Sequence, residues 1–253
     1  MTTRETLAEL EEYDTPSVTN VVATYPDDPL CLGLYNPWSQ DWYTDQSVET
    51  MYPGLGPRAG FAVTCVYGLP DPNFEQLSFM DVVDALDDSP KPTVLALEQD
   101  FPPEVADSVG LTGGNMTTAM QSLGCVGCVS SGPIRDLEEV RPMGFQYLAT
   151  GTAAGHGDMA VHAVDVPVSI RGMDVAPGEV IHMDENGAVK FPAEHLEDVL
   201  ENVRALEERE EELQGRLRDA SDAAAVRAAF AGEEYGDEAD GDGTGEDGTD
   251  GDE

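Results

Sequence analysis

The stretch "GGNMTTAMQSLGCVGCVSSGPIRD" (residues 113–136) decides the fold. It opens with glycines, continues into a helical pattern and an apolar run, and ends in Arg135 and Asp136. A helix followed by a short buried strand is one unit of a parallel α/β sheet. In such sheets, ligands bind at the carboxyl ends of the strands. The stretch therefore predicts a ligand site around the Arg–Asp pair.

The flanking sequence continues this alternation of apolar runs and helical patterns. The order predicts a βαβαβ arrangement with parallel strands and right-handed crossovers. From residue 165 the pattern changes to short alternating segments, with turns at Pro177-Gly178 and Asn186-Gly187, which predicts a β-meander. The expected strands are 61–68, 93–99, 125–131 and 145–151, and the expected helices are 79–88, 116–124 and 136–144.

Two further helices are expected near the ends of the chain. "YDTPSVTNVV" (residues 13–22) predicts a helix with Thr15 as N-cap and Pro16 as its first residue. "FPAEHLEDVLENVRALEEREEELQGRL" (residues 191–217) predicts a longer one. The apolar residues expected on the buried sides are Val18, Val21 and Val22 in the first helix and Leu196, Val199, Leu200, Val203 and Leu206 in the second. Past this stripe, the second helix is expected to reach a neighbouring subunit.

The end of the chain differs in composition. From residue 232 it consists almost wholly of Gly, Asp, Glu and Thr. Such a segment buries too little apolar area to offset the entropy of ordering, so it is predicted to be disordered. The expected organisation is one layered α/β domain (1–218), the end of a C-terminal helical region (219–231) and a disordered acidic tail (232–253).

The chain is strongly acidic. Its 51 Asp and Glu residues face 12 Lys and Arg residues, for a formal net charge of −39. A surface with this charge repels itself in dilute buffer, whereas molar salt screens the repulsion to a few ångströms. We hypothesise that the protein comes from an extreme halophile. The same charge excludes nucleic acid and anionic lipid as direct partners, because both bind basic surfaces.

The sequence also bears on the compartment. No apolar run approaches the roughly 20 residues of a membrane span. The first residues, "MTTRETLAELEEYD", lack the apolar segment of a secretory signal. We therefore expect a soluble cytoplasmic protein with no membrane partner.

Cys125 and Cys128 have the spacing of half a zinc site or of a redox dithiol. A structural zinc site needs two further ligands, and a redox dithiol normally lies at a helix N-terminus. The pair instead lies within an apolar run that reads as a strand, where cysteine acts as a small hydrophobic residue. Core packing is the preferred interpretation.

The segment "GHGDMAVHAVD" brings His156, Asp158 and His162 close together in sequence. A metal cluster is one interpretation, because these are common metal ligands. The three residues do not share a helix face, however, and Gly155 and Gly157 indicate a loop. The preferred interpretation is a loop that closes over a pocket.

The glycine-rich turn and the Arg–Asp pair together suggest a site for a small oxo acid. Backbone N–H groups of residues 113–116, at the start of a helix, would attract an anion. Arg135 would bind a carboxylate through two hydrogen bonds, and Asp136 is a hard oxygen ligand for Mg²⁺. The alternative is structural, with Asp136 capping the next helix and Arg135 in a surface ion pair. Spacing alone leaves both interpretations open.

The opening stretch resembles the signature of the RraA-like family, which includes 4-hydroxy-4-methyl-2-oxoglutarate aldolases and regulators of ribonuclease E activity. "YDTPSVTNVV" is similar to that family's opening helix, "GLGPRAGFAVTCV" to its first core strand, and "VDVPVSIRGMDVAPGEVIHMDENGAVKFP" to its closing β-segment. The resemblance implies a swivelling β/β/α-type domain. It also implies a homotrimer, sometimes doubled to a hexamer, with the active site at the subunit interface.

The resemblance further implies an activity. Arg135 would bind the pyruvyl carboxylate, and Asp136 would hold Mg²⁺ or Mn²⁺. The substrate would be a small 4-hydroxy-2-oxo acid or an oxaloacetate-like acid, and the products would include pyruvate. The residues that would hold the substrate through backbone amides are Gly113, Gly114, Asn115 and Met116.

Two positions depart from the aldolase pattern. Aldolase members usually carry an acidic residue at the position of Gly114 and often Asp at that of Ser131. Replacing Gly114 by Asp is therefore expected to raise the rate. The glycine favours an alternative function, a non-catalytic ring protein that binds and regulates a partner. The intact Arg135–Asp136 pair favours the lyase. An acidic residue in "EEREEEL" of a neighbouring subunit is a further candidate for the site.

Overall fold

The computed structural model describes residues 2–73 and 77–231. The predicted acidic tail, residues 232–253, lies outside the described residues. The chain divides into two compact units between Arg204 and Ala205. The first contains the sheet and the candidate site, and the second begins within the long helix α7 (Leu196–Asp219).

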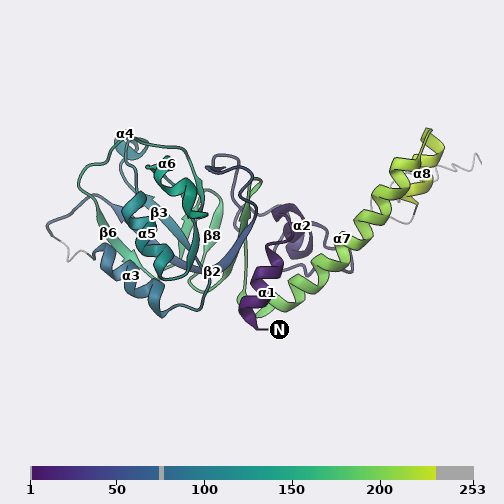
Figure 1. Ribbon diagram of the computed structural model, residues 1–253, viewed down its shortest axis with the longest axis horizontal. Coiled ribbons are helices and arrows are strands. Elements are labelled where there is room, and N and C mark those ends of the chain that lie inside the picture. The colour runs from purple at the N-terminus through teal and green to yellow at the C-terminus, as the bar shows by residue number, and fades with distance from the viewer. Residues whose placement is uncertain (1, 74–76, 232–253) are drawn as a thin grey trace, which may run out of the picture. The chain divides into compact units, whose positions relative to one another are not determined.

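The first unit is built on an eight-stranded mixed sheet (Figure 1). Its centre is four parallel strands, β2 (Arg58–Gly68), β3 (Thr93–Asp100), β4 (Cys125–Ser130) and β5 (Gln146–Ala149). The predicted βαβαβ arrangement is therefore confirmed. The antiparallel strands are β1 (Glu49–Thr50), β6 (Ala160–Val164), β9 (Val180–Asp184) and β10 (Gly187–Phe191).

The two edges of this sheet, formed by β1 and β10, are connected by a short segment of chain. The strand order is β1-β5-β4-β3-β2-β9-β10, and β6 also pairs with β2. Tyr43 forms an isolated bridge with Val189 on β10, and Glu49 pairs with Ala149 on the opposite edge. A few residues of chain therefore connect one edge to the other, and the sheet is nearly closed and barrel-like.

Different layers cover the two faces of the central strands. The helices α3 (Phe79–Asp88), α5 (Gly114–Ser122) and α6 (Leu137–Val140) pack on one face, through residues such as Leu86 and Met120 (Figure 1). On the other face, Ile170 and Met173 belong to a second hairpin, β7 (Val168–Ile170) and β8 (Met173–Val175). The layers are therefore helices, large sheet and small sheet. Successive side chains of each central strand point to opposite faces, so each strand contributes to both cores.

The structure corrects two expectations about the later strands. The expected meander is two separate hairpins, because β8 pairs only with β7 among the described strands, while β9 crosses to β2. The turn between β7 and β8 is formed by Arg171 and Gly172, both with positive φ (47° and 98°). The second half of the expected loop "GHGDMAVHAVD" forms strand β6, which pairs with β2.

The N-terminal region forms α1 (Thr3–Leu10), α2 (Thr15–Thr19) and a π-helical turn, η1 (Asn20–Thr24). The expected N-cap of α2, Thr15, is wrong by one residue: Asp14 caps the helix through the backbone N–H of Ser17. Thr15 instead donates its backbone N–H to the buried Asp184. The valine side chains expected to be buried, Val18, Val21 and Val22, are buried.

The C-terminal helix is confirmed. A short turn, η3 (Ala193–His195), leads into α7, and all five apolar residues of its predicted stripe are buried. The remaining elements are α4 (Pro103–Ala106), the 3-10 turn η2 (Arg141–Met143) and α8 (Ala223–Phe230). Across residues 2–73 and 77–231, none of the helices combines the length and apolar character needed to cross a membrane.

Candidate functional site

A cavity of about 190 Å³ lies beyond the carboxyl ends of β3 and β4. It is enclosed by the loop that leads into α5, the loop that leads into α6 and the loop between β5 and β6. All six sequence-predicted site residues line it. The lining consists of Gly110, Leu111, Thr112, Gly113, Gly114, Asn115, Met116, Arg135, Asp136, His156 and Met159.

Backbone hydrogen bonds hold the first two loops together. Leu111 N–H donates to the carbonyl of Pro133 at 2.9 Å, and Arg135 N–H donates to the carbonyl of Thr112 at 3.0 Å. These two bonds pair residues 111–112 with residues 133–135, outside the named strands. Backbone bonds between the two loops therefore hold the glycine-rich turn beside the Arg–Asp pair.

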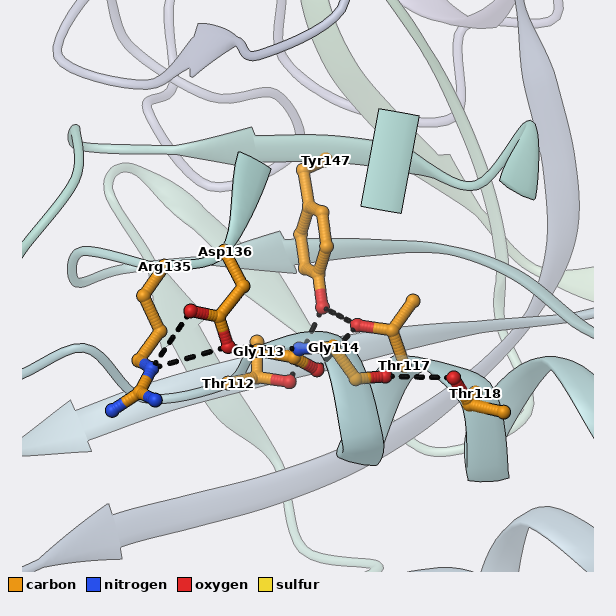
Figure 2. Close-up of polar contacts among 8 residues, drawn as sticks. All are labelled: Thr112, Gly113, Gly114, Thr117, Thr118, Arg135, Asp136 and Tyr147. Atoms are coloured by element: carbon orange, nitrogen blue, oxygen red, sulfur yellow. Dashed lines mark hydrogen bonds and ion pairs between the residues drawn. The ribbon is translucent and has the colours of Figure 1, made fainter. Parts of the chain in front are cut away.

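Asp136 has a left-handed backbone conformation (φ 61°, ψ 38°), which is uncommon for residues other than glycine. It occupies the N-cap position of α6, yet its side chain makes no capping bond there. Oδ2 instead accepts a hydrogen bond at 3.1 Å from the backbone N–H of Gly114, the first residue of α5 (Figure 2). The capping alternative is therefore wrong, since the carboxylate contacts a different helix.

Arg135 pairs with its own neighbour. Its Nε lies 3.2 Å from both Oδ1 and Oδ2 of Asp136, and both side chains are about one-third exposed. The two terminal nitrogens of Arg135 point away from Asp136 (Figure 2), and they have no hydrogen-bond partner among the described residues. Both terminal nitrogens of the guanidinium therefore remain to donate to a ligand carboxylate.

The two glycines of the turn leave room for the carboxylates of Asp136, which precedes α6, and of Glu139 within α6. A Cβ atom at Gly113 would lie 2.2 Å from Oδ2 of Asp136 and 3.0 Å from Cγ of Arg135. A Cβ atom at Gly114 would lie 2.2 Å from Cδ of Glu139, an exposed residue of α6. Sequence reasoning missed Glu139, because its proximity to Gly114 depends on how α6 packs beside α5.

A buried hydroxyl network that involves Tyr147 holds the turn in place (Figure 2). The hydroxyl of Tyr147, on β5, lies 2.6 Å from Oγ1 of Thr117 and 3.2 Å from Oγ1 of Thr112. Thr117 in turn donates to the carbonyl of Gly113 at 2.8 Å. Burial raises the pKa of Tyr147 well above its ordinary value, so the phenol stays protonated. The network fixes the turn and was not predicted, because a tyrosine within a strand gives no signal of its partners.

The histidine segment does not form a metal cluster. His156 lines the cavity, whereas His162 contacts the carbonyl of Leu69 through Nε2 and Asp100 through Nδ1. Within residues 2–73 and 77–231, no three His, Cys, Asp or Glu side chains are grouped so as to hold a metal ion. The interpretation of residues 155–157 as a loop over a pocket agrees with the structure.

Cys125 and Cys128 are buried in β4, within the core under the helices, as expected. Cys65 belongs to the same core cluster, and the three thiols are free. Burial raises the pKa of Cys125 to about 11, so its thiol is unreactive at neutral pH.

The residues of the cavity fit a divalent cation that keeps most of its waters. Asp136 faces the cavity with about one-third of its side chain exposed, and within the described part of the chain its Oδ1 accepts a hydrogen bond from Arg135 only. A carboxylate oxygen has a second acceptor position, and Mg²⁺ is commonly held by one or two carboxylates with water completing its shell. Asp136 is therefore the residue that would hold such an ion.

Sequence comparison identifies related proteins. Residues 39–190 match the family described as RraA-like: Aldolase/RraA. The 4-hydroxy-4-methyl-2-oxoglutarate aldolase of Thermus thermophilus is 35% identical over 88 residues, which are 32% of this chain and 51% of that protein. An uncharacterized protein of Methanocaldococcus jannaschii is 28% identical over 106 residues, 42% of this chain and 51% of that one. The matched part thus spans about half the length of these relatives.

Solved structures show the same fold. An uncharacterized protein from Pseudomonas syringae pv. tomato has a TM-score of 0.68 at 21% identity, covering 89% of this chain and 94% of that chain. RraAS2 of Streptomyces coelicolor, described as an unusual member of the RNase ES inhibitor RraA protein family, has a TM-score of 0.64 at 20% identity, covering 82% and 94%. At these identities the likeness establishes the fold, mixed α/β with a nearly closed sheet and a long C-terminal helix.

Proposed function

The chain belongs to the RraA-like family, and on this premise we propose that it is a metal-dependent lyase that releases pyruvate. The substrate is a small 4-hydroxy-2-oxo acid or an oxaloacetate-like acid. One observation carries the proposal: Asp136, the free donors of Arg135 and the start of α5 meet at a single small cavity. A related aldolase in Thermus thermophilus agrees with this chemistry.

Substrate binding uses the positive groups of the cavity. The free terminal nitrogens of Arg135 bind the carboxylate of the 2-oxo acid through paired hydrogen bonds. The backbone of residues 113–116, at the N-terminus of α5, adds a field that favours negative charge. Both groups are fixed before the substrate arrives, because backbone bonds and the Tyr147 network hold the loops.

The reaction creates an enolate. In aldol cleavage, a base removes the proton of the C4 hydroxyl, the C3–C4 bond breaks, and its electron pair moves into the pyruvate enolate. In decarboxylation, the corresponding C–C bond breaks with loss of CO₂. Arg135 stabilises the negative charge that develops on the 2-oxo acid in either case. A Mg²⁺ or Mn²⁺ ion held by Asp136 would supply further positive charge for this enolate.

We also propose a homotrimer or hexamer with the cavity at a subunit interface, which rests on family membership. The alternative function is a non-catalytic ring protein that regulates a partner. Its support is the glycine at position 114, where no acidic side chain is present. The neighbouring carboxylate of Glu139 weakens that argument, because it supplies negative charge at the same place.

The test is pyruvate release at molar salt with Mg²⁺ or Mn²⁺, using oxaloacetate and a panel of 4-hydroxy-2-oxo acids. The lyase proposal expects turnover that needs the metal ion and is lost in Asp136→Asn. Equal pyruvate release by the wild type and this variant would remove the lyase function and leave the regulatory ring protein. Sedimentation velocity in the same buffer gives the oligomeric state.

A further inference from the structure

The proposed cleavage needs a group that takes one proton and returns it. Among the residues that line the cavity, the ionisable side chains are Arg135, Asp136 and His156. Arginine does not release its proton in proteins. The carboxylate of Asp136 is engaged by Arg135 and by the N–H of Gly114, and it is the residue that would hold the metal ion. Among the lining residues that this chain itself supplies, His156 is left as the candidate proton carrier.

The loop that carries His156 is fixed to both other loops of the site. Ala153 N–H donates to the carbonyl of Ile134 at 2.9 Å, just before the Arg–Asp pair. Gly110 N–H donates to the carbonyl of Gly155 at 2.9 Å, just before the glycine-rich turn. These bonds flank His156 on its N-terminal side and hold the segment beside the cavity that its side chain lines.

A local contact selects the tautomer of the imidazole. Nδ1 of His156 lies 2.9 Å from the carbonyl oxygen of Gly157. A carbonyl oxygen only accepts, so Nδ1 carries the hydrogen, and Nε2 keeps the lone pair. A neutral imidazole in this tautomer is ready to accept a proton at Nε2.

Glu139 is the nearest competitor. Its carboxyl group contacts Gly114, but it is absent from the cavity lining and lies on the side toward which a Gly114 side chain would project. It therefore lies beside Gly114 and not among the groups that line the cavity.

We propose that His156 is the proton-transfer residue of the cavity, an inference that rests on the lyase function proposed above. Nε2 accepts the C4 hydroxyl proton as the C3–C4 bond breaks, which leaves a carbonyl compound and the pyruvate enolate. The imidazolium then returns one proton from Nε2 to C3 of the enolate. Pyruvate forms, and His156 is again neutral, so protons and charges balance over one turnover.

This role distinguishes the two reactions of the site. Aldol cleavage requires removal of the hydroxyl proton, so it depends on a base. Decarboxylation of oxaloacetate has no such proton to remove, and water can protonate the enolate that results. Loss of the imidazole should therefore affect cleavage far more than decarboxylation. A merely structural role would reduce both reactions alike.

The experiment compares His156→Gln with the wild type and with His162→Gln, a matched control whose histidine pairs with Asp100 and does not line the cavity. kcat and KM are measured for both reactions across pH at molar salt with Mg²⁺. We expect His156→Gln to lower kcat for cleavage by about 10²-fold or more, with little change in KM. In the same variant, kcat for decarboxylation should fall less than tenfold. The decrease in the cleavage rate at low pH, where the base is protonated, should disappear. His162→Gln should match the wild type in both reactions.

Two results would overturn the inference while leaving the lyase function in place. One is a His156→Gln cleavage rate close to that of the wild type with the same pH profile. The other is an equal loss of both reactions. A wild-type protein without metal-dependent pyruvate release, or one matched by Asp136→Asn, would instead remove the lyase function and the inference together.

Discussion

The carboxylate of Asp136 accepts a hydrogen bond at 3.1 Å from the backbone N–H of Gly114. This bond links the loop between β4 and α6 to the start of α5. The helix N-terminus favours the negative charge, and Arg135 fixes the carboxylate from the other side. A short acidic side chain on a left-handed backbone is thereby held in one position at the edge of the cavity.

Asp136→Asn is expected to abolish metal-dependent pyruvate release, because the variant keeps the shape of the side chain and loses the charge that would hold the cation. Glu138→Gln is the matched control, since it removes one charge from an exposed residue of the same helix. Steady-state assays with Mg²⁺ measure the turnover, and thermal unfolding at the same salt confirms that both variants fold. Full turnover in Asp136→Asn would contradict the assignment.

Arg135→Ala is expected to lower kcat/KM, because a two-pronged charged hydrogen bond to the substrate carboxylate is lost. The corresponding loss of transition-state stabilisation is about 2–4 kcal/mol. Arg141→Ala serves as the control: this arginine follows α6 and pairs with the exposed Glu138. Similar kcat/KM values for the two variants would show that Arg135 does not bind the substrate.

Alanine at each glycine of the turn should have a different effect. In Gly113→Ala the new Cβ would meet Oδ2 of Asp136, a short side chain with few ways to move aside. In Gly114→Ala it meets the end of the long, exposed side chain of Glu139, which can swing into solvent. We therefore expect Gly113→Ala to lose most activity while remaining folded and Gly114→Ala to stay within about threefold of the wild type. The reverse order in a pyruvate-release assay would contradict this placement.

Gly114→Asp tests the role that the resemblance to the aldolases implies for this position. That resemblance predicts that an acidic side chain here raises the rate, by up to the 10²–10⁴-fold typical of general acid–base catalysis. The structure places the carboxyl group of Glu139 where the new side chain would lie, so one carboxylate would only replace another. We now expect kcat within about threefold of the wild type, with Gly114→Asn as the uncharged control. A gain of tenfold or more would restore the earlier expectation.

The central strands could be predicted from the sequence because each is a single apolar run that is buried on both faces, as in β3 and β4. Strand β6 was missed because Gly155 and Gly157 precede it and gave the whole segment the composition of a loop. The N-cap of α2 was misplaced because Asp14 and Thr15 are both good caps, and the choice depends on a bond between Thr15 and Asp184, far away in sequence.

In the candidate site, too, local sequence patterns predicted some residues and missed others. Arg135, Asp136 and the glycine-rich turn belong to one continuous stretch, so a local pattern was sufficient to group them. The contacts of Glu139 with Gly114 and of Tyr147 with Thr117 join elements whose relative placement no local pattern encodes. His156 was noticed as a possible ligand, but its place in the cavity follows from the backbone bonds of its loop.

His182 is buried outside the cavity lining, and it makes the stability of the fold depend on pH. Nδ1 of His182, on β9, lies 3.1 Å from the hydroxyl of Thr15, and Nε2 lies 3.2 Å from the carbonyl of Leu10. The carbonyl requires a hydrogen on Nε2, so the neutral ring accepts the hydroxyl hydrogen of Thr15 at Nδ1. Burial lowers the pKa of His182 to about 4, although Asp184 acts in the opposite direction.

His182→Gln should therefore change how stability depends on pH. In the unfolded chain histidine has a pKa of about 6.5, above the folded value, so the unfolded state binds more protons between pH 6.5 and 4. Stability contributed by the neutral ring is complete above pH 6.5, falls by up to about 1.4 kcal/mol per pH unit below it, and levels off near pH 4. Urea unfolding at molar salt should show His182→Gln to be less stable at pH 7, yet to lose less stability on acidification than the wild type. Because the carboxylates are common to both proteins, parallel curves would contradict a buried neutral His182.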